Sequence, residues 1–201
     1  MDRIIETQKI INQLNDVKTL LDVGCRDTIL KNGLKHQIEY YGCDLYQNKY
    51  NNVTYVGDIT KIKIDKKFDC VCALDILEHV DDPYTLIEKL FDLTNKYLIV
   101  SLPNIYDLKS KYKYVFKNTL GGKYKFNTTN QEDRHRWIMN YDEIINFLQF
   151  YAKKYNTSLT IYDIRYGDIK FNIVSLIGIL LRFLFSKKST TSAIIGVFSK
   201  K

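Results

Sequence analysis

The sequence of 201 residues lacks a hydrophobic run long enough to cross a lipid bilayer. Its most apolar stretch, residues 171–185, is shorter than the ~20 residues that a membrane-spanning helix needs, and Arg182 interrupts it. The N-terminus begins Met1-Asp2-Arg3, without the apolar segment of a secretory signal. From these absences we expect a cytoplasmic protein.

Cysteine is scarce, and its spacing does not fit a metal site. The four cysteines are Cys25, Cys43, Cys70 and Cys72, each within or at the end of a predicted strand. Cys70 and Cys72 would share one face of a strand, which is not the spacing of a zinc knuckle. Free cysteines in such places act as small apolar residues. We therefore predict no metal site and no disulfide framework, and a reducing compartment fits.

Arginine is also scarce, which affects how the positive charge is interpreted. The formal net charge is +7, but 24 of the 30 basic residues are lysine. Proteins that read phosphates and bases tend to use the arginine fork. We therefore favour the other explanation of the charge, in which a genome rich in A and T has placed lysine on solvated faces. Nucleic acid is therefore the less favoured partner.

Length and pattern predict one α/β domain over residues 1–201. Seven apolar stretches predict strands at residues 20–23, 38–44, 53–56, 68–74, 97–102, 159–164 and 193–198. Helical patterns over residues 2–16, 27–34, 84–93 and 141–155 lie between them. Strands that alternate with helices predict a Rossmann-like, seven-stranded sheet with helices on both faces.

Acidic residues stand at the ends of the first two predicted strands. The first apolar run ends in Asp22-Val23-Gly24, which is typical of a buried parallel strand that opens into a ligand-binding loop. About twenty residues later the second run ends in Asp44, at the spacing that nucleotide-binding folds use to hold ribose hydroxyls. The sequence therefore predicts a cofactor that carries a ribose.

Five segments, in this order, resemble the class I S-adenosylmethionine-dependent methyltransferases. They are Leu-Asp-Val-Gly-Cys at 21–25, Tyr-Gly-Cys-Asp at 41–44, Val-Gly-Asp-Ile at 56–59, Ala-Leu-Asp-Ile-Leu-Glu-His-Val-Asp-Asp-Pro at 73–83, and Val-Ser-Leu-Pro-Asn at 100–104. The resemblance covers about the first half of the chain. It implies S-adenosylmethionine as cofactor and a mostly parallel sheet whose last strand is antiparallel.

The resemblance also implies the residues that bind the cofactor. They are Asp22, Gly24, Cys25, Arg26, Asp44, Leu45, Asp58, Ile59 and Leu74. In the family, the residue matching Asp58 accepts the adenine amino group and the backbone of the next residue meets the ring. A turn aspartate without a ligand is the alternative for Asp58.

The first motif departs from the family pattern. Two further glycines usually follow Gly24, and Arg26 and Thr28 occupy those places. Glycine there allows a positive φ and a close approach of the backbone to the cofactor. We hypothesise that Arg26 compensates by facing the amino-acid carboxylate of the cofactor; the alternative is an arginine turned to solvent.

Residues 105–140 predict an insertion on the substrate side. Between 109 and 125 the chain carries six lysines, no acidic residue and interleaved aromatic residues. This composition is compatible with a lid over the substrate or with a solvated loop. It is also compatible with a surface that follows an RNA backbone and stacks its aromatic residues on the bases.

The last part of this insertion carries the catalytic candidate, His135, as a general base, because histidine titrates near neutrality. Arg134 and Arg136 could hold an anionic group, and Trp137 could stack on a ring or sugar face. The alternative is a surface group in which Trp137 anchors the next helix.

Asn104 is a further candidate for contact with the acceptor. Ser-Leu-Pro-Asn at 101–104 is not the Asp/Asn-Pro-Pro-aromatic motif of adenine and glutamine N-methyltransferases, which counts against DNA-adenine modification. Pro-Asn at this strand end, followed by Arg-His-Arg-Trp at 134–137, resembles the small-molecule and glycan branches. The predicted function is O-methylation of a small molecule or of a sugar or glycan precursor. An RNA methyltransferase and a non-catalytic binding subunit are the alternatives.

Residues 171–185 would be apolar almost all round if helical. Packing one side on the sheet would leave the other exposed, which marks a homodimer interface or peripheral docking on a membrane. A fully buried helix is the third interpretation. Membrane docking would bring the protein near lipid-linked glycan acceptors.

Overall fold

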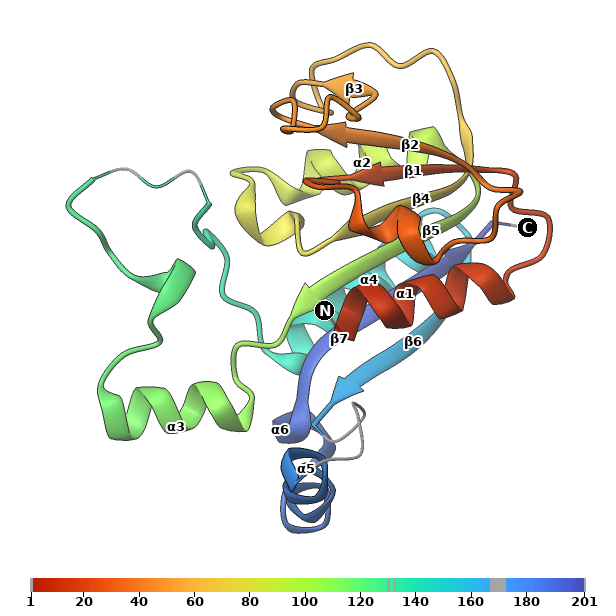
Figure 1. The fold of residues 1–201 in the computed structure, drawn as a ribbon. Helices are drawn as coiled ribbons and strands as arrows, with labels where there is room; N and C mark the ends of the chain where they lie inside the picture. The colour runs from red at the N-terminus through yellow and green to blue at the C-terminus, as the bar shows by residue number, and fades with distance from the viewer. Residues whose placement is uncertain (1, 130, 132, 167–172, 201) are drawn as a thin grey trace.

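A seven-stranded sheet forms the centre of the computed structural model, which describes residues 2–129, 131, 133–166 and 173–200 (Figure 1). The strands are β1 (Thr19–Val23), β2 (Glu39–Asp44), β3 (Tyr55–Val56), β4 (Phe68–Leu74), β5 (Thr94–Pro103), β6 (Ser158–Arg165) and β7 (Thr191–Ser199). Their order in the sheet is β3-β2-β1-β4-β5-β7-β6. All seven predicted strands are present.

The sheet is parallel except at its last strand. β1 pairs in parallel with β2 and β4, and β3 and β5 extend the parallel part on either side. β7 is antiparallel to both of its neighbours: Phe198 lies opposite Leu98 of β5 and Leu159 of β6. The predicted Rossmann-like sheet with an antiparallel last strand is confirmed.

Helices cover both faces of the sheet because buried side chains alternate along the strands. α1 (Asp2–Gln13) and the 3₁₀ helix η1 (Ile29–Gly33) cover one face, where Leu20 joins Ile10 and Ile11 in one apolar core. α2 (Pro83–Leu93) and α4 (Tyr141–Lys154) cover the other face, where Leu21 belongs to a second core (Figure 1). The period of two along β1 thus divides the interior into two layers.

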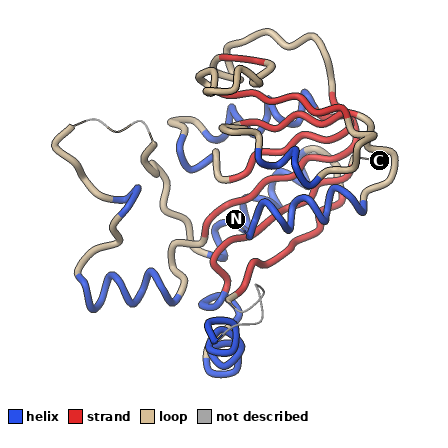
Figure 2. Tube along the Cα trace, in the orientation of Figure 1, coloured by secondary structure: helices blue, strands red, loops and turns tan. Residues whose placement is uncertain are grey.

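The segment between β5 and α4 projects from the carboxyl ends of the parallel strands. It contains α3 (Leu108–Lys117) and the 3₁₀ helix η3 (Gly122–Tyr124), and most of the rest is loop (Figure 2). α3 buries no side chain, and Asp107 caps it by accepting a hydrogen bond from the Ser110 amide at 2.8 Å. This segment corresponds to the insertion predicted at 105–140.

The predicted apolar helix is present as α5 (Ile173–Leu184), while residues 171 and 172 lie outside the described residues. α5 lies beyond the short helix α6 (Lys187–Thr190), away from the sheet (Figure 1). Ile177, Ile179, Leu180, Phe183 and Leu184 have exposed fractions between 42% and 84%. The interpretation of a fully buried helix is therefore wrong. Among the described residues, no helix is long and apolar enough to cross a membrane.

Candidate active site

The loop after β1 requires glycine at position 24. Gly24 has a φ of +76°, and a Cβ atom there would lie 2.0 Å from Cδ1 of Ile76, which follows β4. The amides of Gly24 and Cys25 both donate to the carbonyl of Cys43 at the end of β2, at 2.8 and 3.2 Å. The loop is therefore fixed against both neighbouring strands.

Asp44 holds the next part of this loop. One carboxylate oxygen accepts the Arg26 amide at 2.8 Å, and the other accepts the amide of Leu45 at 2.7 Å. Each carboxylate oxygen has two lone pairs, so each can accept one more hydrogen bond. The group has the chemistry and the free capacity that two ribose hydroxyls need.

Arg26 and Thr28 adopt the conformation for which the family uses glycine. Their φ angles are +47° and +55°, and Thr28 is buried. Such a conformation costs a β-branched residue about 1–3 kcal/mol, so contacts must hold it. The Thr28 amide donates to Cys25 at 2.7 Å, its hydroxyl accepts from Asn52 at 3.1 Å, and Asn48 donates to the Arg26 carbonyl at 2.7 Å. The loop keeps its shape without the two glycines.

Asp22 and Cys25 support the loop from inside. Asp22 is buried and accepts the Tyr40 hydroxyl at 2.6 Å. Burial raises the pKa of Asp22 to about 7 and the pKa of the Cys25 thiol to about 12. Near neutrality the Cys25 thiol is therefore protonated, and the Asp22 carboxyl is protonated in about half of the molecules. Their roles in cofactor binding stay predictions.

The loop after β3 presents Asp58 and Ile59. One oxygen of Asp58 accepts the amide and the hydroxyl of Thr60 at 3.0 and 2.7 Å, and the other pairs with Lys61 at 3.1 Å. Ile59 is buried, Leu74 at the end of β4 is half-buried, and Leu45 is exposed. The proposed contacts of Asp58, Ile59, Leu45 and Leu74 with the cofactor stay predictions.

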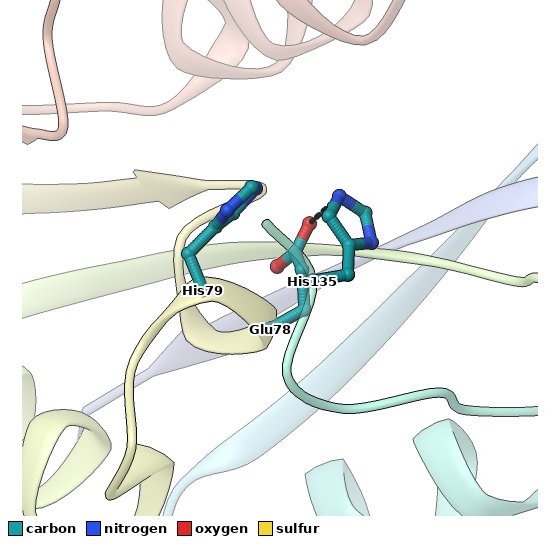
Figure 3. Close-up of side chains that lie close together, drawn as sticks. All are labelled: Glu78, His79 and His135. Carbon is teal, nitrogen blue, oxygen red and sulfur yellow. Dashed lines mark ion pairs between the residues drawn. The ribbon is translucent and has the colours of Figure 1, made fainter. Parts of the chain in front are cut away.

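Glu78, His79 and His135 form a cluster that the sequence analysis did not predict (Figure 3). Glu78 and His79 come from the 3₁₀ helix η2 (Leu77–His79) after β4, and His135 comes from the chain after η3. One ligand atom from each residue lies within 4.8 Å of the others. Glu78 is 0% exposed, and among the described residues neither of its carboxyl oxygens has a hydrogen-bond partner.

The surroundings of the cluster make both imidazoles weak bases. Burial, and then the charge of His79, lowers the pKa of His135 to about 4, and burial followed by the charge of Lys123 lowers the pKa of His79. Burial and the charge of Asp75 raise the pKa of Glu78. The His135 ring lies edge-on to the rings of His79 and Tyr124, with centroids 4.5 and 4.6 Å away. His135 is therefore neutral at pH 7, but it attracts a proton only weakly.

Asp133 connects the cluster to the loop after β1 (residues 24–28), which is the predicted cofactor loop. Its Oδ1 lies 3.1 Å from Nη2 of Arg26, 2.9 Å from Nζ of Lys123 and 3.3 Å from Nδ1 of His79. The exposed Arg26 side chain thus bridges the loop after β1 and the segment after η3. Its predicted contact with the carboxylate of the cofactor stays a prediction.

Arg136 and Trp137 anchor the segment after η3. The amide of Arg136 donates to the Glu78 carbonyl and its Nε donates to the His79 carbonyl, both at 2.7 Å. Nε1 of Trp137 donates to the Val80 carbonyl at 2.9 Å. These bonds favour the anchoring interpretation for both residues. Arg134 is exposed, and its contact with a substrate stays a prediction.

A cavity of about 290 Å³ lies beside this segment. Its lining is mostly apolar and includes Leu77, Leu102, Trp137 and Phe147. Trp137 is 40% exposed, so part of its ring is free to contact another molecule. Leu77 of η2, the residue before Glu78 in the chain, is part of this lining.

Asn104 has a structural role. Its Nδ2 donates to the carbonyls of Lys188 and Thr191 at 2.9 and 2.7 Å, and its Oδ1 accepts the Tyr106 amide at 3.1 Å. Both amide hydrogens are thus used to join the end of β5 to the start of β7. The side chain is buried, so we do not carry its predicted contact with substrate further.

Solved structures of several methyltransferases share this fold. The small RNA methyltransferase HEN1 aligns with a TM-score of 0.68 and 18% identity over 99% of this chain, which spans 25% of that chain. A SAM-dependent methyltransferase from Archaeoglobus fulgidus aligns at 0.64 and 16% identity over 98% of this chain and 93% of that one. The plantazolicin methyltransferase BamL, solved with a triazolic desmethylPZN analog and SAH, aligns at 0.64 and 14% identity over 98% and 84%.

The order of the strands and the loops at their carboxyl ends define a Rossmann-like methyltransferase fold. The methyltransferase-domain family model matches residues 3–154, and the chain belongs to that family. No curated protein matches the chain. The protein is a methyltransferase. The free lone pairs of Asp44 suit the ribose of S-adenosylmethionine, and binding of this cofactor at Asp44 stays a prediction.

Proposed function

We propose that this protein transfers a methyl group from S-adenosylmethionine to a hydroxyl oxygen of a small-molecule or sugar acceptor. The observation that carries the proposal is the cluster of Glu78, His79 and His135, which Asp133 connects to the cofactor loop. The cofactor supplies a methyl group on a good leaving group. The chain must align the acceptor with that methyl group and remove the hydroxyl proton.

The chemistry of the cluster supports a hydroxyl acceptor. A neutral amine attacks with its lone pair and can lose its proton afterwards, whereas a hydroxyl needs help to lose its proton during the reaction. Two imidazoles and a carboxyl beside the cofactor loop supply groups that can take up or displace this proton. Proton transfer by a positioned side chain contributes ~10²–10⁴ in rate.

The cavity supports an acceptor of small size. Its volume of about 290 Å³ is at the lower end of the ~300–1,000 Å³ that small-molecule sites occupy. The exposed part of Trp137 suits the face of an aromatic ring or of a sugar. The segment that carries Trp137 also carries His135, so an acceptor in the cavity would lie near the cluster.

Methyl transfer to a panel of acceptors tests the proposal. The panel contains nucleotide sugars, free monosaccharides, phenols and short RNAs, with radiolabelled S-adenosylmethionine. We expect turnover with a hydroxyl-bearing small molecule, and we expect His135→Ala to lower kcat by ~10²–10⁴ without changing the affinity for S-adenosylhomocysteine. His36→Ala, which alters an exposed histidine outside the cluster, is the control. Full turnover of His135→Ala across pH 6–8 would remove His135 from the mechanism.

RNA methylation is the second candidate, and α3 favours it. Tyr112, Tyr114 and Phe116 are exposed on this helix; Lys111 precedes them, and Lys113 lies between the two tyrosines. Aromatic stacking platforms beside cationic side chains are typical of single-strand binding. RNA binding that weakens steeply with salt, and weakens further in a variant with Lys111→Gln and Lys113→Gln, would support it. A non-catalytic subunit is the third alternative, which binding of S-adenosylhomocysteine by the purified protein would contradict.

The exposed apolar side chains of α5 support our prediction of a homodimer contact or of peripheral docking on a membrane. Sedimentation of the protein without lipid measures whether it forms a homodimer. Flotation with anionic liposomes at low salt measures the second, and protein that stays wholly at the bottom contradicts docking. The cytoplasmic location stays a prediction.

A further inference from the structure

We propose that Glu78, His79 and His135 bind a divalent metal ion (Figure 3). One carboxylate oxygen and two imidazole nitrogens form a donor set that zinc and similar transition metals accept. Three protein ligands leave at least one position on the ion for water or for a substrate oxygen. The inference that an ion binds rests on these residues and not on the proposed function, whereas the role of the ion in the reaction rests on the proposed function.

The buried carboxyl of Glu78 is the first argument for an ion. Glu78 is wholly buried, and within the part of the chain that the structure describes both of its oxygens lack a hydrogen-bond partner. Buried polar groups in proteins nearly always have a partner, because an unpartnered one is costly. A cation beside Glu78 would supply that partner. The Nδ1 atoms of His79 and His135 are also buried, and they too lack a hydrogen bond to any residue that the structure describes.

The geometry of the three side chains is the second argument. Nε2 of His135 lies 3.9 Å from Oε1 of Glu78, and Figure 3 shows these two side chains directed toward each other. Donor atoms bound to one ion at ~2.0–2.2 Å lie about 3–3.5 Å from one another. The ligand atoms of the cluster lie within 4.8 Å of one another, so the widest separation needs to contract by about 1.3–1.8 Å. The two imidazole planes are inclined by 79°, so the rings do not stack.

The charges around His79 decide how an ion would be accommodated. Asp133 lies 3.3 Å from Nδ1 of His79, and a carboxylate beside a ligand imidazole commonly orients such rings. Lys123 lies 3.4 Å from Nε2 of the same ring and would repel a cation. Its side chain is 37% exposed, so it can turn toward solvent and keep its ion pair with Asp133. An ion therefore replaces Lys123 as the positive charge beside the cluster.

The ion has a defined task in the proposed reaction. With the acceptor oxygen on its open position, the ion lowers the pKa of the hydroxyl, as it does for bound water. The O–H bond breaks and the proton passes to solvent. The oxygen then forms its bond to the methyl carbon while the carbon–sulfur bond breaks, and that electron pair remains on sulfur. This arrangement gives the hydroxyl a way to lose its proton to solvent.

Metal binding to the whole protein tests the inference directly. Protein treated with a chelator is titrated with Zn²⁺ by calorimetry, and with Co²⁺ by its visible absorption spectrum. We expect one ion per chain. Glu78→Gln and His135→Ala should each weaken binding by at least ~100-fold, because loss of even an outer partner costs 10–100-fold. His36→Ala should bind the ion as the unaltered protein does.

Two controls keep the result interpretable. Circular dichroism and the affinity for S-adenosylhomocysteine report whether each variant is folded, and His79→Ala replaces any variant that is not. Absence of Zn²⁺ and Co²⁺ binding, or equal binding by folded Glu78→Gln, overturns the inference. Full methyl transfer after chelation overturns the catalytic task of the ion and leaves the proposed function standing. Normal metal binding without methyl transfer to any hydroxyl acceptor contradicts the proposed function alone.

Discussion

Asp44 and Glu78 both lie at the carboxyl edge of the sheet, but the chain treats their carboxyl groups in opposite ways. Asp44, the last residue of β2, accepts two backbone amides and holds the loop after β1, which is also bound to the carbonyl of Cys43. Glu78 is buried, and no partner for its oxygens is found among the described residues. The side predicted to bind the cofactor is thus organised in advance by backbone hydrogen bonds. The side that we propose for the acceptor carries a buried carboxyl group with no partner among the described residues.

Gly24→Ala, in the loop after β1, should lower the stability of the protein most. The substitution places a Cβ at φ +76°, 2.0 Å from Cδ1 of Ile76. Backbone strain and overpacking together should lower the free energy of unfolding by about 2–5 kcal/mol. Denaturant unfolding measures this loss, with Gly121→Ala, also at a positive φ but in open space, as the control for strain alone. Equal losses in the two variants would show that the contact with Ile76 does not matter.

The buried Asp22 should make the free energy of unfolding depend on pH. Burial raises its pKa from 3.8 to about 7, so the folded protein holds this proton more tightly than the unfolded chain does. The contribution to stability is complete below pH 3.8, falls as the pH rises, and is lost above about 7. Asp22→Asn should therefore be more stable than the unaltered protein by about 2–4 kcal/mol at pH 8, and of similar stability at pH 4. A stability difference that does not change between these pH values contradicts the prediction.

Asp44→Ala tests whether the organised carboxylate binds the cofactor. Loss of two ribose hydrogen bonds should cost about 1–3 kcal/mol, which weakens binding of S-adenosylmethionine by roughly 10- to 100-fold. Calorimetry with S-adenosylhomocysteine measures the loss. Asp44→Asn keeps one acceptor oxygen, so its affinity should lie between those of the unaltered protein and Asp44→Ala. Unchanged affinity in Asp44→Ala would rule out the ribose contact.

Arg26→Gly should have the smallest effect and sharpens the comparison. Glycine suits the φ of +47°, and the exposed ion pair with Asp133 contributes only about 0–1 kcal/mol. We expect nearly unchanged stability and a cofactor affinity that is equal or better. A tenfold loss of affinity would instead support the hypothesis that Arg26 faces the carboxylate of the cofactor.

The fold could be predicted because each strand carries a local signal. The apolar run at residues 68–74 has the bounds of β4, and the Asp82-Pro83 pair predicts the start of α2, where Asp82 accepts the amides of Tyr84 and Thr85 at 3.0 Å. β3 is shorter than predicted, because only Tyr55 and Val56 pair with β2. Short edge pairings depend on the neighbouring strand rather than on local pattern.

The cluster could not be predicted, because its members have no fixed spacing. Glu78 and His79 are adjacent, but His135 reaches them only after the insertion returns to the sheet. The positive φ of Arg26 and Thr28 was also hidden, because tertiary contacts with Asp44 and Asn52 hold it rather than the residue types themselves. Sequence shows local preference, whereas these features depend on contacts between distant segments.

The position of β7 has a consequence for how the chain folds. β7 lies between β5 and β6, and its pairs with β5 join residues as distant as Tyr97 and Ser199. Pairings across so much sequence close slowly, so the last strand should set the rate of folding. Before β7 arrives, β5 presents an unpaired apolar edge, which is a template for association with other chains. A fragment that ends at residue 154, where the family match ends, would keep that edge open and should aggregate rather than remain a monomer.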